Sequence, residues 1–132
     1  MQLGSTLEGV DEGENIVRAA LQQSRLPEDD RYWVLLAVRE VLVNAARHGN
    51  RFDPDKRVFL RVSIGDDAIT VEVGDEGEGF EPAHVPDPKM KQNLDKQSGR
   101  GLLIARSFLD AVIIGPREPH GTLVHLLKRT PV

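Results

Sequence analysis

The chain has 132 residues, of which 39% are hydrophobic and 29% charged, a composition typical of one globular domain. Its net charge of −4 argues against direct nucleic-acid binding through a broad positive field, and the absence of cysteine excludes disulfide scaffolds, thiolate metal sites and cysteine nucleophiles. No apolar run reaches the length of a membrane span and no export signal is visible, so we expect a cytoplasmic protein without a membrane partner.

The first helix is predicted close to the N-terminus. Asp11 or Glu12 can begin it, apolar residues continue through Leu21, and Pro27 interrupts the pattern. A short strand near residues 2–8 is weakly indicated ahead of it. Exposed apolar residues on this helix would suit either a homodimer or another protein partner.

The second helix has a stronger signal. Residues 27–30 supply an acidic first turn, and apolar residues then recur at helical spacing from Tyr32 to His48. Gly49 and Asn50 end the helix, because both residues tolerate the left-handed backbone conformation.

Two β-hairpins are predicted, the first of them from a change to period-two alternation. In the first, residues 58–64 and 69–73 alternate apolar and polar side chains around the turn 65–67. In the second, residues 111–114 and 122–128 flank a turn rich in glycine and proline. The first hairpin is expected to bury one face.

The segment between the hairpins is polar and long. Residues 81–98 contain three prolines and three lysines, which predicts either a functional lid or a disordered insert. Residues 101–110 predict a third helix. The fold class is therefore α+β: a single domain over 1–132, a two-layer sandwich with three helices on one face of a mostly antiparallel, mixed sheet.

A polar stripe interrupts the second helix. Glu40, Asn44 and His48 are spaced four residues apart, so their side chains lie on one face. A solvated helix face would explain any one of them alone. Asparagine is an unfavourable residue in mid-helix, however, so its presence here suggests a function beyond helix formation.

Glycine-rich loops follow a strand and precede a helix. Asp75 stands at the end of the first hairpin and is followed by Gly77 and Gly79, which permit close approach of another group. Gly99 and Gly101 open the third helix, where free N–H groups suit an anion such as phosphate. An acidic turn and a flexible helix entry are the ordinary alternatives.

The combination is more specific than its parts. In order, the chain contains E-x-x-x-N-A-x-x-H-G on a helix, D-x-G-x-G-F after a strand, G-x-G-L opening a helix and G-T opening a strand. This series resembles the N-box and glycine motifs of the GHKL ATPase and kinase superfamily, whose domain is called the Bergerat fold. The forms REVLVNAARHG and GRGLLIARSFLD are similar to those of the anti-sigma-factor serine kinases of bacteria, and the resemblance spans about residues 7–128.

The resemblance implies a role for each matching residue. Asn44 would coordinate the Mg²⁺ that bridges the phosphates of ATP, and Glu40 would be the general base for an incoming hydroxyl. Asp75 would accept a hydrogen bond from the adenine amine. The other implied ATP contacts are Arg47, His48, Gly77, Gly79, Phe80, Gly99, Arg100, Gly101, Leu102 and Thr122.

The resemblance also implies a function and its alternatives. An anti-sigma-factor kinase sequesters a sigma factor and phosphorylates a serine of an anti-anti-sigma antagonist, thereby regulating transcription. A non-catalytic module that binds ATP and only sequesters its partner needs the same pocket, but Glu40 favours the kinase. A sensor histidine kinase fragment is less well supported, because no dimerisation helix with a phosphoacceptor histidine precedes Glu40. Gyrase-type and mismatch-repair ATPases would need a transducer domain.

Overall fold

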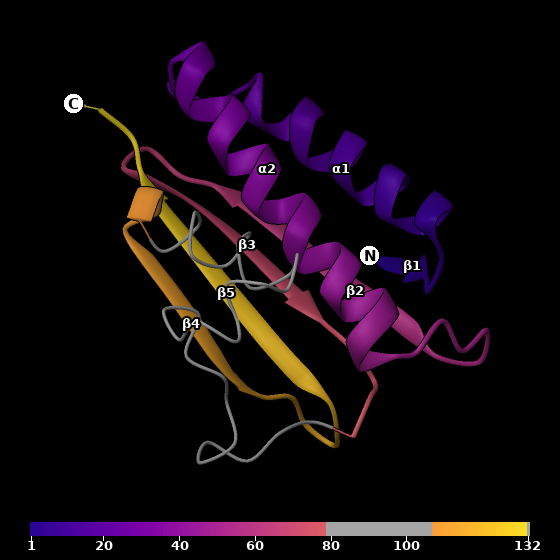
Figure 1. The fold of residues 1–132 in the computed structure, drawn as a ribbon. Helices are drawn as coiled ribbons and strands as arrows, with labels where there is room; N and C mark the ends of the chain where they lie inside the picture. Colours follow the sequence, from indigo (N-terminus) through magenta and orange to yellow (C-terminus); the bar gives the residue numbers. More distant parts are fainter. Residues whose placement is uncertain (79–106, 132) are drawn as a thin grey trace.

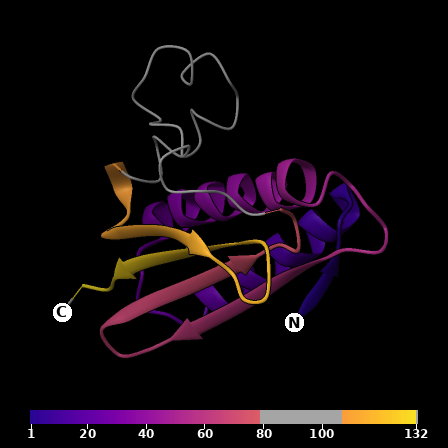
Figure 2. The same ribbon diagram turned by 90° about the horizontal axis from the view of Figure 1, so that it is seen from below.

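Two long helices lie across one face of a five-stranded sheet in the computed structural model, which describes residues 1–78 and 107–131 (Figure 1). The two layers are visible from a second direction in Figure 2. In chain order the described elements are β1 (Gln2–Gly4), α1 (Leu7–Leu21), α2 (Glu28–Asn44), the π-helical turn η1 (Ala45–Gly49), β2 (Arg57–Ile64), β3 (Ala68–Gly74), β4 (Ala111–Pro116) and β5 (Thr122–Arg129).

The expected α+β sandwich is confirmed, with two corrections. Two α-helices rather than three are found in the described residues. The predicted lid at 81–98 and most of the predicted helix at 101–110 lie outside them. The sheet is also not mixed: its order is β1-β2-β3-β5-β4, and all four pairings of described strands are antiparallel. The two hairpins join through β3 and β5, and no crossover brings two described strands into the same direction.

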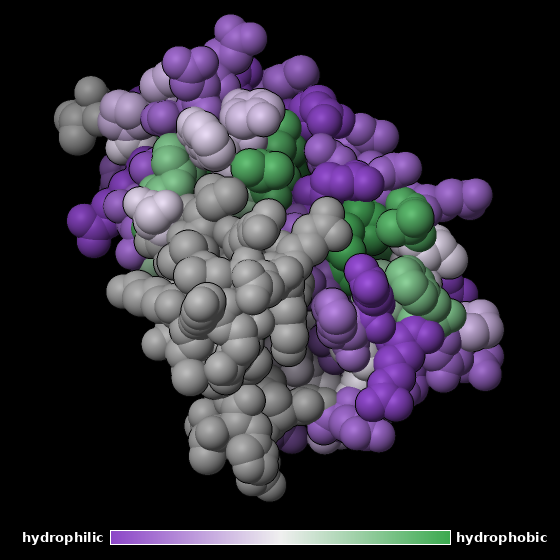
Figure 3. Space-filling model, in the orientation of Figure 1, coloured by the Kyte–Doolittle hydropathy of each residue, from purple (hydrophilic) through white to green (hydrophobic). Residues whose placement is uncertain are grey.

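The core lies between the two layers. Alternate residues of β3 face the helices, and Val71 opposite Leu126 of β5 is an example in which both partners are almost fully buried. The described surface in Figure 3 is mostly hydrophilic, because the apolar side chains gather inside. Within the described ranges, no helix combines the length and the apolar character needed to cross a membrane.

Helix α1 begins earlier than its apolar pattern predicts. The Oγ1 of Thr6 accepts a hydrogen bond from the Gly9 N–H at 2.9 Å and caps the helix, so the first turn starts at Leu7 rather than at Asp11 or Glu12. The threonine cap supplies a start signal that the apolar periodicity does not contain. The predicted N-terminal strand is present but short, ending at Gly4.

Helix α2 changes its hydrogen-bonding pattern at its C-terminal end. After Asn44 it continues as the π-helical turn η1, and the Asn50 N–H donates to the Ala45 carbonyl at 2.8 Å. The left-handed residues are not the expected Gly49 and Asn50 but Arg51 and Phe52, with φ of 52° and 55°. Because the π turn is wider than an α-helical turn, the chain continues past the expected end of the helix before it changes direction.

Asn50 is a buried junction between three segments. Its Nδ2 donates to the Ser5 Oγ and to the Arg57 carbonyl, each at 2.9 Å, and its Oδ1 accepts from the Glu76 N–H at 2.8 Å. The side chain is fully buried, so no water replaces these bonds. Asn50 therefore fixes the loop after β3 beneath η1.

Replacing this side chain tests the junction. Asn50→Ala is expected to lower the free energy of unfolding by roughly 2–4 kcal/mol, because buried groups lose their partners. Urea unfolding measures the change, with Gln23→Ala at an exposed position as the control. A loss for Asn50→Ala no larger than that of Gln23→Ala would show that the junction is dispensable.

Candidate functional site

A pocket of about 260 Å³ lies where the end of α2 and η1 meets the sheet. Its lining combines an apolar wall with a few polar groups, the usual make-up of a small-molecule site. The lining residues are Val41, Asn44, Ala45, His48, Gly49, Val73, Asp75, Ile114, Thr122 and Val124. The fold thus brings together four predicted site residues from two helical segments and both hairpins.

Asp75 is the buried carboxylate of this pocket, with 5% of its surface exposed. Its Oδ1 accepts hydrogen bonds from the Gly77 N–H at 2.9 Å and the Thr122 N–H at 3.2 Å. Its own N–H donates to the Thr122 carbonyl at 2.9 Å, which ties the end of β3 to the start of β5. The carboxylate is therefore held in one orientation.

Three glycines enclose Asp75 so closely that no side chain would fit. A Cβ on Gly49 would stand 2.2 Å from the Asp75 Oδ2, and one on Gly121 would stand 1.9 Å from the Asp75 carbonyl. A Cβ on Gly77 would meet the Gly49 carbonyl at 2.2 Å. Gly121 has a φ of 110° as well, which side-chain-bearing residues rarely adopt. These glycines bring the backbone up to the carboxylate from three sides.

Burial raises the pKa of Asp75 above that of an exposed aspartate. The hydrogen bonds from Gly77 and Thr122 and the positive charges of Arg117 and Lys56 act in the opposite direction. A bound donor group such as an exocyclic amine would further favour the ionised form. The pocket therefore presents a buried hydrogen-bond acceptor.

Asn44 contributes an unsatisfied oxygen. Its Oδ1 is buried and has no hydrogen-bond partner in the described part of the chain. An amide oxygen is a ligand that Mg²⁺ accepts, usually together with waters and phosphate oxygens. Residues 1–78 and 107–131 hold no cluster of three or more His, Asp or Glu able to bind a metal, so a cation would need such outside ligands here.

Glu40 lies one turn before Asn44 on α2 and is half-buried. Burial raises the pKa of its carboxyl group above the ordinary value. Its side chain does not belong to the lining of the pocket. It is therefore placed beside the pocket rather than in it.

The other predicted contacts divide into two groups. His48 is exposed and lines the pocket, whereas Arg47 is exposed and outside the lining. The remaining predicted contacts lie outside the described residues: Gly79, Phe80, Gly99, Arg100, Gly101 and Leu102. The apolar wall, formed by Val41, Val73, Ile114 and Val124, was not predicted, and of these four only Val73 belongs to the alternation found in the sequence.

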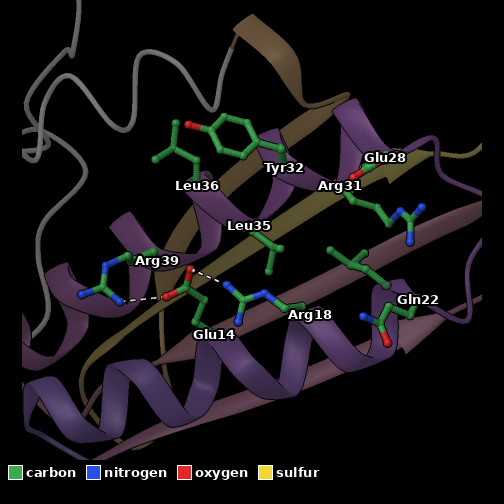
Figure 4. A pocket seen from close by; sticks show the side chains of 10 residues that line it. Glu14, Arg18, Gln22, Glu28, Arg31, Tyr32, Leu35, Leu36 and Arg39 are labelled. Atoms are coloured by element: carbon green, nitrogen blue, oxygen red, sulfur yellow. Dashed lines mark hydrogen bonds and ion pairs between the residues drawn. The ribbon is translucent and has the colours of Figure 1, made fainter.

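A second cavity of about 370 Å³ lies between α1 and α2 (Figure 4). Glu14 bridges two arginines there, accepting from Arg18 at 3.2 Å and from Arg39 at 2.8 Å. Leu35 and Leu36 add apolar surface. It shares no lining residue with the Asp75 pocket. Its other charged lining residues are Glu28 and Arg31, and the buried Nε of Arg31 has no hydrogen-bond partner in the described part of the chain.

The chain resembles known proteins in both sequence and fold. Residues 3–128 match the histidine kinase-like ATPase domain. An anti-sigma F factor of Heyndrickxia coagulans is 35% identical over 95 residues, covering 69% of this chain and 64% of that protein. One of Geobacillus stearothermophilus is 34% identical over 115 residues, covering 85% and 78%. The solved mycobacterial sensor histidine kinase MprB shares the fold, with a TM-score of 0.62 and 22% identity, over 93% of this chain and 95% of that one.

Proposed function

The chain belongs to the histidine kinase-like ATPase domain family, in the branch that includes the anti-sigma F factors, and from this premise we propose that it is an anti-sigma-factor serine kinase. In this proposal it binds ATP with Mg²⁺, sequesters a sigma factor and phosphorylates a serine of an anti-anti-sigma antagonist. The supporting observation is the pocket that joins the buried carboxylate of Asp75 to the unpartnered oxygen of Asn44.

Asp75 would select the base of the nucleotide. Its fixed carboxylate presents an acceptor, which pairs with the exocyclic amine of adenine but repels the carbonyl at the same position of guanine. The apolar wall would pack against the ring. Thr122 holds the carboxylate through its backbone N–H, and Gly77 does so from the other side.

Asn44 would hold Mg²⁺ through its Oδ1. When bound, the cation would neutralise charge on the phosphates. His48, exposed at the same pocket, is proposed to have a supporting polar role.

Glu40 would act as the general base. The serine Oγ would form a bond to the γ-phosphorus while the bond from that phosphorus to the ADP oxygen breaks, and the hydroxyl proton would pass to the Glu40 carboxylate. Its raised pKa suits this role, because a base works best with a pKa near the operating pH.

A second candidate is a module that binds ATP and only sequesters its partner. The position of Glu40 outside the pocket lining favours it. Incubating the protein with labelled ATP, a sigma factor and a candidate antagonist distinguishes the two. Label on an antagonist serine supports the kinase, and partner binding without any label supports the sequestering module.

The cation site is tested by Asn44→Ala. We expect the variant to remain folded and to lose at least about tenfold in affinity for ATP in the presence of Mg²⁺, because one oxygen ligand is removed. Calorimetry with and without Mg²⁺ measures this difference. Asn15→Ala, at an exposed position on α1, is the control. A folded Asn44→Ala protein with unchanged affinity for MgATP would remove Asn44 from the site.

A further inference from the structure

Arg117 joins the turn between β4 and β5 to a distant strand. Its guanidinium carbon lies 4.0 Å from the centre of the Phe59 ring on β2. Its Nη1 donates to the His120 carbonyl at 3.2 Å, and its backbone N–H donates to the Gly121 carbonyl at 3.0 Å. The side chain therefore anchors the turn on the sheet.

The side chain reaches Phe59 by crossing β3 at Gly74. A Cβ on Gly74 would stand 3.0 Å from the Arg117 Cδ, and Gly74 is paired with Phe59 in the register of β2 and β3. Successive residues of a strand point to opposite faces. Arg117 therefore lies on the face of β3 that points away from the pocket. Asp75, the residue after Gly74, points to the other face, towards Gly49 and the pocket.

The turn that Arg117 anchors is the one that holds Asp75. Gly121 packs against the Asp75 carbonyl, and Thr122 exchanges two hydrogen bonds with Asp75, one through each backbone group. The positive charge of Arg117 also favours the ionised form of that carboxylate. Geometry and charge therefore both connect Arg117 to the same acceptor, from the face of the sheet opposite the pocket.

We infer that Arg117 is a positioning residue for base recognition, which fixes the Thr122 turn and keeps Asp75 oriented and charged for the exocyclic amine of an adenine nucleotide. The inference rests on the proposed function in one respect, that ATP is the ligand. The link between Arg117 and the state of Asp75 holds without a nucleotide.

Other titratable groups lie around Asp75, and one of them supplies a control. Lys56, in the loop before β2, also favours the ionised carboxylate by its charge, but it does not belong to the 117–122 turn. His48 lines the same pocket from η1, and Glu76 is the adjacent residue of the loop. Lys56→Met therefore removes a neighbouring charge without releasing the turn.

The experiment compares Arg117→Met, Arg117→Lys and Lys56→Met in the full chain. Calorimetry measures ATP and GTP affinity at several pH values, and carbon NMR follows the Asp75 carboxyl without nucleotide. For Arg117→Met we expect a fall in ATP affinity of roughly 5- to 10-fold, deeper at acidic pH, with a higher Asp75 titration midpoint and a narrower preference for ATP over GTP. Arg117→Lys is expected to retain the midpoint and most of the affinity, and Lys56→Met to move both less than Arg117→Met.

A steric variant provides an independent test. Gly74→Ala is expected to displace the Arg117 side chain and to weaken ATP binding in the wild-type background, but to add little to Arg117→Met. An unchanged Asp75 midpoint in Arg117→Met, or wild-type ATP affinity there, would overturn the inference. A folded wild-type chain that binds no ATP would count against the proposed function instead, and the Asp75 titration would still decide the role of Arg117.

Discussion

Glu40→Gln is expected to slow phosphate transfer to an antagonist serine at least about 100-fold, the usual scale for loss of general-base assistance. The glutamine keeps the size and helix propensity of the residue, so the fold and ATP affinity should persist. Single-turnover transfer from labelled ATP measures the rate. Glu28→Gln, an exposed position in the first turn of the same helix, is the matched control.

The pH profile separates a base from a residue that only shapes the site. Burial raises the pKa of Glu40, so the wild-type rate should fall on acidification at a higher pH than an ordinary glutamate would give. That decline should be absent from the residual rate of Glu40→Gln. Undiminished transfer by the variant would exclude Glu40 as the base and would leave the proton acceptor to be found elsewhere.

The local elements of the fold were predictable because their signals are local. The first hairpin followed from period-two alternation, the second from a turn rich in glycine and proline, and α2 from helical spacing. The start of α1 depended on one cap at Thr6, which apolar spacing cannot show. The antiparallel joining of β3 to β5 depends on contacts between residues far apart in the sequence, so local patterns left the sheet direction open.

The candidate site was predictable only as far as its motifs reach. The ordered motifs pointed to Asn44, Asp75 and Thr122, which the fold does place around one pocket. Asn50 and Arg117 carried no such signal, because their importance comes from partners on other strands. A sequence motif therefore indicates the residues that line a pocket better than the residues that hold those residues in position.

The orientation of Asp75 makes a change of base preference the sharpest test of the pocket. Asp75→Asn turns one acceptor oxygen into a donor group, and the loss of a buried hydrogen bond to a charged group costs on the order of 1–3 kcal/mol. ATP affinity should therefore fall about 5- to 150-fold, with a smaller preference for ATP over GTP. Calorimetry with both nucleotides measures these changes.

For Asp75→Asn, we expect the free energy of unfolding to change in the opposite direction to the ATP affinity. Because burial raises the pKa of Asp75, ionisation of this group disfavours the nucleotide-free fold: its favourable contribution is present at low pH and is lost as the pH rises through the raised pKa. Asp75→Asn removes that charge, so its free energy of unfolding at neutral pH should equal or exceed that of the wild type. Its advantage should shrink on acidification. A variant that is destabilised at neutral pH and keeps wild-type selectivity for ATP would make Asp75 a turn residue, whereas a stable variant with weakened ATP binding would show that the chain holds a costly buried charge for its ligand.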